Sequence, residues 1–532
     1  MKLISLIMAA GLILNLFVYA YFFSSVVTLV TALLVSFFVG YLIRRWFRVM
    51  PVNSKEHGWV LGEAEECSDP DKPIAIDRLT LPADYLVLGA LCLGSPKAGK
   101  TESFALGIMS QISHIWPNSG YAFFEGKGDT DIYMKLVAAT GGPDYFFSTE
   151  LAGSCSINLM SGEPRDVVDR LKLSLIGHTA STSFYSDEQL ARLTLVVPVL
   201  KSLGMAVSLR DLYTVVAIED AESELLRLAQ AAPNCDAAAL SLYKEWVNSD
   251  EHAKRVSALQ GLLNRLFIFV YGSHTDRLNT YQPDIDVSEI VKGGKSVYFH
   301  LPLTDYTRSV AIALVEMFHV ESRRRQNEGC HNAIPYPLFF DDWGAFFHSN
   351  FGPFSSRCRS AKLPLFFSFQ SLSQMTKVDP AFAAELDDNV ANKFIMRVMG
   401  QETGEYGVAL LGAHDRLEVG LSDVRTNLPG TSLASREVAR FSTQDLKSLR
   451  AGEVYISTLV DKDNETQNLI LKTRLPLPCF DGWREVSMPS AAHIDGATGE
   501  GLNFWLKYMD RAKLTEIQHR AEGDTAAFEE IV

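Results

Sequence analysis

The residues best suited to chemistry lie in two short stretches that are far apart in the chain. The first has the form G-x-x-x-x-G-K-[ST] and consists of Gly94, Ser95, Pro96, Lys97, Ala98, Gly99, Lys100 and Thr101. In such a loop, glycines let backbone N–H groups face phosphate oxygens. Lys100 is expected to reach the β- and γ-phosphates, and the Thr101 hydroxyl to ligate Mg²⁺. The loop therefore predicts a site for a nucleoside triphosphate; the alternative is a glycine-rich turn that happens to contain lysine.

The second stretch is Phe339-Phe340-Asp341-Asp342, in which two carboxylates follow a short apolar run. Phosphoryl transfer requires a carboxylate for the metal and a group that orients the attacking water. We expect Asp341 to hold Mg²⁺ through its water shell and Asp342 to polarise water. Alone, the pair equally fits an ordinary strand end that meets solvent. Together with the loop, it predicts a hydrolytic site at the carboxyl end of a buried strand, where open α/β sheets bind ligands.

Further candidates surround the apolar stretch Leu363–Gln370. The Gln370 amide at its end is expected to bond the γ-phosphate or the water, the alternative being a strand end capped by a helix that starts at Ser371. Arg357 and Arg359 precede this stretch. An arginine that reaches into a neighbouring subunit's site would stabilise the charge on the transferred phosphoryl group; solvated surface is the alternative.

The elements that must position these residues follow an α/β pattern. The apolar run Tyr85–Leu93 predicts a buried parallel strand before the loop, and the helical spacing over Thr101–Ser113 predicts a helix after it. Gly120–Glu125, Thr130–Thr140 and Tyr145–Phe147 continue the alternation as strand, helix and strand. Such alternation with short turns predicts an open parallel sheet.

The strand pattern stops at about residue 160 and resumes after residue 284. Between these positions apolar residues recur at helical spacing, so we expect an all-α insertion over 160–284. The nucleotide-binding domain then has two parts, 84–159 and 285–478. Its later strands are predicted at Ser296–Leu301, Tyr336–Asp342, Leu363–Gln370, Asn392–Val398 and Glu453–Leu459, with a weaker one at Asn468–Lys472. Residues 479–532 are expected to form a tail, with an amphipathic helix over Gly501–Glu522.

The N-terminus carries a membrane signal. No charged residue occurs from Leu3 to Ile43, roughly twice the ~20 residues that cross a bilayer, and Ser24-Ser25 divides the stretch. Residues 1–50 are therefore predicted to form a transmembrane helical hairpin, followed by a juxtamembrane linker over 51–83. Lys2 and the arginines after Ile43 place both ends in the cytoplasm. A cleaved signal peptide is the alternative.

Composition narrows the classes of function. The net charge of −14 excludes an overall basic surface of the kind that binds nucleic acid non-specifically, so any DNA contacts must be local, as in a lined channel. The 7 cysteines form no C-x-x-C pair, which argues against a disulfide framework and a zinc site.

In their order, these pieces resemble the type IV secretion coupling proteins, the membrane-anchored hexameric RecA-like ATPases of bacterial conjugation. Besides the spans and the two chemical stretches, the resemblance includes the following segments: Glu125–Asp129, Asn158-Leu159, Phe369–Gln374, and Asn392–Arg397 with Glu402-Thr403. It implies a RecA-like P-loop domain that uses ATP and Mg²⁺. By spacing from Asp341 and Gln370, Arg359 matches the family's arginine-finger position better than Arg357.

The resemblance also implies partners and a location. The chain is expected to form a homo-oligomer, hexameric when active, at the bacterial inner membrane. Its expected partners are the inner-membrane components of a type IV secretion system and a relaxase with single-stranded DNA, or protein effectors. Two departures are evident: Asp342 stands where the family usually has Glu, and almost no segment separates the two spans. Two alternatives follow from the shared loop, namely an ATP-binding receptor or scaffold with little hydrolysis and a membrane-anchored DNA translocase in chromosome segregation.

Overall fold

The computed structural model describes residues 57–176, 184–233, 235–248, 259–329, 333–346, 351–376, 380–422, 430–462, 465–490 and 501–509. The predicted transmembrane hairpin over 1–50 lies outside these residues. Within the described ranges no helix combines the length and apolar character needed to cross a membrane.

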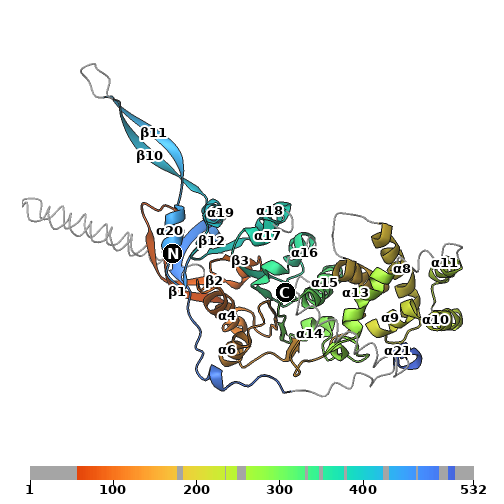
Figure 1. Cartoon of the computed structure of the whole chain (residues 1–532). Helices are drawn as coiled ribbons and strands as arrows, with labels where there is room; N and C mark the ends of the chain where they lie inside the picture. Colours follow the sequence, from red (N-terminus) through yellow and green to blue (C-terminus); the bar gives the residue numbers. More distant parts are fainter. Residues whose placement is uncertain are drawn as a thin grey trace, which may run out of the picture.

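A large sheet forms the centre of the described chain (Figure 1). It has 11 strands, in the order β2-β1-β13-β12-β9-β3-β8-β7-β4-β6-β5. The strands from β9 to β5 are parallel, whereas those from β2 to β12 are antiparallel. The parallel strands are β3 (Ala90–Leu93), β4 (Ala122–Glu125), β5 (Tyr145–Ser148), β6 (Val297–His300), β7 (Leu338–Asp341), β8 (Leu365–Phe369) and β9 (Asn392–Ile395). The antiparallel strands are β1 (Gly58–Glu66), β2 (Ile74–Pro82), β12 (Glu453–Lys462) and β13 (Glu465–Arg474). This mixed fold confirms the predicted α/β class with a large parallel sheet, whereas the antiparallel pairing of β2, β1, β13 and β12 departs from the expected all-parallel arrangement.

The parallel strands are short and apolar on both faces, since helices cover both sides. Rings stack from strand to strand: the Phe124 ring lies with its centroid 4.6 Å from that of Phe299 and 4.8 Å from that of Phe340. The covering elements are α3 (Ala83–Leu86), a π-helical turn (Lys100–Ala105), α4 (Leu106–Met109), α5 (Ile112–Ile115), α6 (Thr130–Thr140), α14 (Val287–Lys292), α15 (Asp305–Glu328), α16 (Phe351–Cys358), α17 (Ser373–Thr376), α18 (Pro380–Asn389), α19 (Gln401–Leu411) and α20 (Thr443–Ser448).

The strand before the phosphate loop is shorter than the predicted Tyr85–Leu93. Its first part is the helix α3, and only Ala90–Leu93 is extended. The chain turns at Gly89, which has a φ of +76°, and the side-chain amide of Asn392 donates to the carbonyls of Tyr85 and Gly89 at 2.9 and 2.6 Å. A continuous apolar run cannot reveal this turn, because both the helix and the strand are buried.

Between β5 and β6, the described residues form helices and no strand, apart from isolated bridges that pair Ile157 with Ile285 and Ala206 with Gly501. The helices are α7 (Pro164–Leu171), a π-helical turn (Lys172–Ile176), α8 (Phe184–Ser202), α9 (Leu209–Ala217), α10 (Glu219–Ala231), α11 (Ala237–Val247), α13 (Gln260–Val270), a 3₁₀ turn (Thr275–Leu278) and α14. Figure 1 shows α8 to α11 grouped at one end of the body. Their core is continuous with one face of the sheet, because Leu193 and Leu262 belong to the same buried cluster as Phe124.

Three segments differ from the sequence expectations. The linker predicted over 51–83 instead contains β1 and β2, which extend the sheet because β1 pairs with β13. A two-stranded hairpin, β10 (Ala413–Ser422) and β11 (Gly430–Ala439), projects from the body where no element was expected (Figure 1). In the tail, the helix α21 covers only Phe504–Tyr508 of the predicted Gly501–Glu522, and residues from 510 onward lie outside the described ranges.

Candidate nucleotide-binding site

The phosphate loop leaves the carboxyl end of β3 and is held from three sides. The N–H of Gly94 donates to the Phe369 carbonyl at 3.2 Å, and the N–H of Ser95 donates to the Arg397 carbonyl at 2.7 Å. The N–H of Gly452 donates to the Ala98 carbonyl at 2.8 Å. Gly99 has a φ of +107°, and a Cβ there would lie 3.2 Å from the Gly452 nitrogen, so a larger residue is strained and crowded. The loop is thus fixed by β8, β9 and the turn before β12.

Lys100 and Thr101 begin the π-helical turn and face the carboxyl edge of the sheet. Lys100 is only 5% exposed, and its ammonium donates to the Gly94 and Ser95 carbonyls at 2.8 and 3.2 Å. Burial lowers the pKa of Lys100, and the nearby Lys127 ammonium adds to that lowering, while the Asp341 carboxylate opposes it. Thr101 Oγ1 donates to Asp341 Oδ2 at 2.7 Å. The structure therefore brings together the loop and the acidic strand, although Thr101 and Asp341 are 240 positions apart.

A buried serine, which the sequence did not single out, holds the two aspartates. The Ser368 hydroxyl donates to Asp341 Oδ1 and accepts from the N–H of Asp342 at 3.2 Å. Ser368 and Asp341 are 2% and 1% exposed. The sequence does contain a signal that could have identified Ser368, since it is the one polar residue of the apolar strand β8. What could not be read was that β8 lies between β3 and β7, next to Asp341.

Asp342 stands at the turn after β7 with a φ of +49°, a left-handed conformation that is uncommon for a residue with a side chain. Gln370 Nε2 donates to Asp342 Oδ1 at 3.1 Å, so these two predicted residues meet. The Lys127 ammonium forms an ion pair with the other carboxylate oxygen, Oδ2. Lys127 comes from the turn after β4 and had no predicted role in the site.

Glu125, the last residue of β4, shapes that turn. Its carboxylate is fully buried and accepts backbone N–H bonds from Lys127 at 2.7 Å, Gly128 at 2.8 Å and Asp129 at 3.2 Å. Burial raises the pKa of Glu125 to about 7; the three N–H bonds lower it, and the Asp341 charge adds to the increase. The buried Glu125 carboxyl group therefore holds the backbone that carries Lys127.

A cleft of about 620 Å³ opens at this edge of the sheet, a size suited to a small ligand. It is lined by Pro96, Lys97, Gly99, Lys100, Thr101, Glu102, Ser103, Lys127, Asp129, Ile132, Lys135, Gln370, Ala451, Gly452, Arg474, Leu475 and Leu477. The ammonium groups of Lys100 and Lys127 and the wrapped loop suit phosphate oxygens. The hydroxyl of Thr101 and the carboxylate of Asp341 are the hard oxygen ligands that Mg²⁺ takes. The residues present therefore fit a nucleotide with Mg²⁺.

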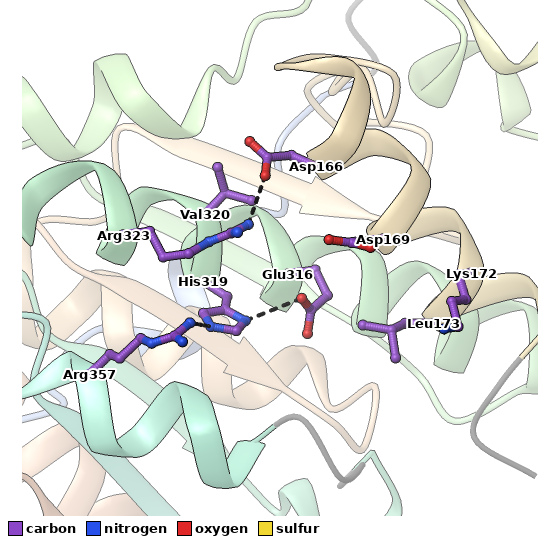
Figure 2. A pocket seen from close by; sticks show the side chains of 9 residues that line it. All are labelled: Asp166, Asp169, Lys172, Leu173, Glu316, His319, Val320, Arg323 and Arg357. Atoms are coloured by element: carbon purple, nitrogen blue, oxygen red, sulfur yellow. Dashed lines mark hydrogen bonds and ion pairs between the residues drawn. The ribbon is translucent and has the colours of Figure 1, made fainter. Parts of the chain in front are cut away.

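The two candidate arginines differ in their surroundings, and neither lines this cleft. Arg357, on α16, donates to His319 Nε2 at 3.0 Å, and His319 Nδ1 lies 3.3 Å from Glu316 Oε2 on the same helix α15 (Figure 2). This chain of contacts lies in a second cleft of about 300 Å³ between α7, α15 and α16. Arg359 follows the end of α16 and is exposed.

No protein-family model and no curated protein matches the chain. Solved structures do match. The bacterial conjugative coupling protein TrwBdeltaN70, in an unbound monoclinic form, matches with a TM-score of 0.54 and 14% identity over 76% of this chain and 88% of that one. The plasmid coupling protein TrwB in complex with the non-hydrolysable GTP analogue GDPNP has a TM-score of 0.53 at 14% identity, covering 75% of this chain and 88% of TrwB.

TrwB in complex with ADP and Mg²⁺ likewise has a TM-score of 0.53, at 13% identity, covering 77% of this chain and 89% of TrwB. At such identities the likeness concerns the fold. The chain has the fold of the conjugative coupling proteins, as the resemblance in the sequence implied.

Proposed function

We propose that this chain is an ATP-hydrolysing coupling protein that delivers substrates to a type IV secretion or conjugation channel. One observation carries the proposal: in a chain with the TrwB fold, Thr101 Oγ1 donates to Asp341 Oδ2 at 2.7 Å. That contact joins a phosphate loop to a metal-binding carboxylate, as a nucleotide-hydrolysing site requires. TrwB itself is described in complexes with the ATP analogue ADPNP and with ADP and Mg²⁺.

Each residue of the site then has a defined task. The loop N–H groups and the Lys100 ammonium bind the β- and γ-phosphates of ATP. Thr101 and Asp341 hold Mg²⁺, which supplies positive charge against the phosphate oxygens when bound. Ser368 fixes the orientation of Asp341 by its hydrogen bond to Oδ1.

Asp342 and Gln370 are proposed to orient the attacking water together. Asp342 is one methylene shorter than the Glu usual in the family, but its Oδ1 is bonded to the Gln370 amide at 3.1 Å. A water bonded to both side chains would be held by a carboxylate acceptor and an amide, so the pair can do what a longer carboxylate does alone.

Arg359 is proposed to complete the site of a neighbouring subunit. It is exposed at the end of α16, whereas Arg357 on the same helix is engaged by His319. An exposed guanidinium is free to reach across a subunit boundary and stabilise charge on the phosphoryl group. The active form would be a homo-oligomer, with six subunits as the resemblance implies.

The remaining assignments follow from the proposed class. Residues 1–50 would anchor the chain in the bacterial inner membrane as a helical hairpin beside the channel's inner-membrane components. The helical region over 160–284 would face the cytoplasm and receive a relaxase with single-stranded DNA, or protein effectors. The net charge of −14 requires DNA contacts to be local rather than spread over the surface.

A second candidate is an ATP-binding receptor that hydrolyses ATP slowly. It is favoured by the short Asp342 side chain and by its ion pair with Lys127, which occupies the carboxylate in this state. Hydrolysis by the full-length oligomer in detergent, with and without single-stranded DNA, separates the two candidates. Stimulation by DNA that is lost in Asp341→Asn supports the motor, whereas ATP binding without turnover supports the receptor.

The proposed ATP-hydrolysing function of the site is tested by Lys100→Ala. Since Lys100 carries the buried ammonium of the loop, the variant is expected to lose both ATP hydrolysis and substrate transfer in a mating assay. Lys72→Ala removes a lysine whose side chain is 85% exposed and serves as the matched control. Transfer at the wild-type rate by Lys100→Ala would refute an ATP-driven function at this site.

A further inference from the structure

Lys127 belongs to neither the phosphate loop nor the acidic strand, yet it lies in the site. Its side chain is 45% exposed and lines the cleft together with Lys100 and Thr101. Its ammonium is paired with the Asp342 carboxylate, whose side chain is only 5% exposed. One lysine thus faces both the space available to a ligand and the residue assigned to the attacking water.

The backbone under Lys127 is held rigidly. Besides the three N–H bonds to Glu125, the two glycines of the turn are required by close approaches. A Cβ at Gly126 would lie 2.9 Å from Phe346 Cε2, and Gly128 has a φ of +78° with its Cβ position 2.6 Å from Pro302 Cβ. Because the backbone cannot shift easily, any change of partner must come from rotation of the Lys127 side chain, which has four flexible torsions and is half exposed.

The observed partners leave less of the Asp342 carboxylate available to a water. Gln370 Nε2 bonds Oδ1, and the Lys127 ammonium occupies Oδ2. Both carboxylate oxygens are therefore engaged in the observed arrangement. A terminal phosphate in the cleft offers the ammonium a partner with more negative charge than one carboxylate.

We infer that Lys127 is a triphosphate sensor, which exchanges Asp342 for the terminal phosphate of the nucleotide in the cleft and so releases Asp342 to orient water. The inference rests on the proposed ATP-binding function and deepens it. A diphosphate lacks the group that draws the ammonium away, so Asp342 stays paired and the site stays in its resting arrangement. Lys100, in contrast, is buried in the loop and serves both nucleotides.

Equilibrium binding tests this without relying on turnover. Dissociation constants of the full-length protein for ADP and for a non-hydrolysable ATP analogue, each with Mg²⁺, are compared between wild type and Lys127→Ala. Loss of one charge-assisted contact should weaken binding of the analogue about 10-fold and that of ADP about 2-fold or less. Lys127→Arg should restore most of the preference because it keeps the charge. Lys72→Ala, with the same change in net charge, should alter neither constant.

A second variant tests the exchange itself. In Asp342→Asn the ammonium no longer leaves a carboxylate to bind phosphate, so the analogue should bind about 3- to 10-fold more tightly than to wild type. In the double variant with Lys127→Ala this gain should vanish, since it acts through Lys127. A gain that persists in the double variant, or equal effects of Lys127→Ala on both nucleotides, overturns the inference. If wild type binds neither nucleotide, the proposed function fails; if wild type binds both and Lys127→Ala changes nothing, only the sensor fails.

Discussion

Replacing Ser368 with alanine is expected to disturb the metal-holding carboxylate more than the fold. In the structure, the Ser368 hydroxyl donates to Asp341 Oδ1 and accepts from the N–H of Asp342. The variant removes both bonds from a site where Ser368 and Asp341 are 2% and 1% exposed, so water does not readily replace them. It also leaves Asp341 with the single observed side-chain bond from Thr101.

The magnitude follows from these two bonds. Leaving a buried polar group without its partner costs about 1–3 kcal/mol, equivalent to about 5- to 150-fold in an equilibrium constant. Because Thr101 still holds Oδ2, the effect on Asp341 should lie toward the lower end, at about 10-fold. We therefore expect the Mg²⁺ concentration for half-maximal ATP hydrolysis to rise about 10-fold in Ser368→Ala.

The assay is hydrolysis by the full-length protein over a range of Mg²⁺ concentrations, with thermal unfolding measured in parallel. Ser322→Ala is the matched control, since Ser322 is fully buried in α15 and its hydroxyl bonds back to the His319 carbonyl at 2.7 Å. That variant should keep the wild-type Mg²⁺ requirement. The reasoning is refuted if Ser368→Ala loses stability but keeps its Mg²⁺ requirement, or if Ser322→Ala shifts the requirement as much.

Two further predictions concern stability. Because the pKa of Glu125 is raised from 4.5 to about 7 in the fold, the folded state binds more protons than the unfolded state between these values. The stability that protonated Glu125 contributes is complete below its unfolded pKa and is lost as pH rises through about 7, by ~3 kcal/mol in all. Between about pH 5 and about pH 8, Tm should therefore fall more steeply in wild type than in Glu125→Gln. Parallel Tm profiles of the two proteins would contradict this. In the tail, Trp505 is 7% exposed, its ring lies 5.0 Å from that of Tyr271, and the Arg210 guanidinium lies over it. Trp505→Ala should therefore speed proteolysis of residues 501–509 while leaving nucleotide affinity unchanged. Leu506→Ala, at a position that is 62% exposed, is the control, and equal cleavage of both variants would argue against this docking.

Features of the site that depend on neighbours in the chain were predictable. The order of strand, glycine-containing loop and helix lies within one continuous stretch around Lys100, and the Asp pair directly follows its strand. Apolar runs and helical spacing likewise indicated the parallel sheet and the change to helices after β5, because burial on both faces and a helical period both leave local patterns. The exact ends were less accessible: Gly89 divides one apolar run into helix and strand.

Contacts between distant segments depended on the order of strands, which no local pattern encodes. β8 lies between β3 and β7, and only this arrangement places Ser368 against Asp341. The pairing of β4 with β7 similarly brings the turn that carries Lys127 to Asp342. The segment of β2 was interpreted as part of a linker because this edge strand exposes several of its residues. In the described part of the tail, α21 buries Phe504 and Trp505. The sequence by itself identified the residue types of the site. The tertiary structure decided which groups each carboxylate contacts, because packing brings those groups together from distant segments.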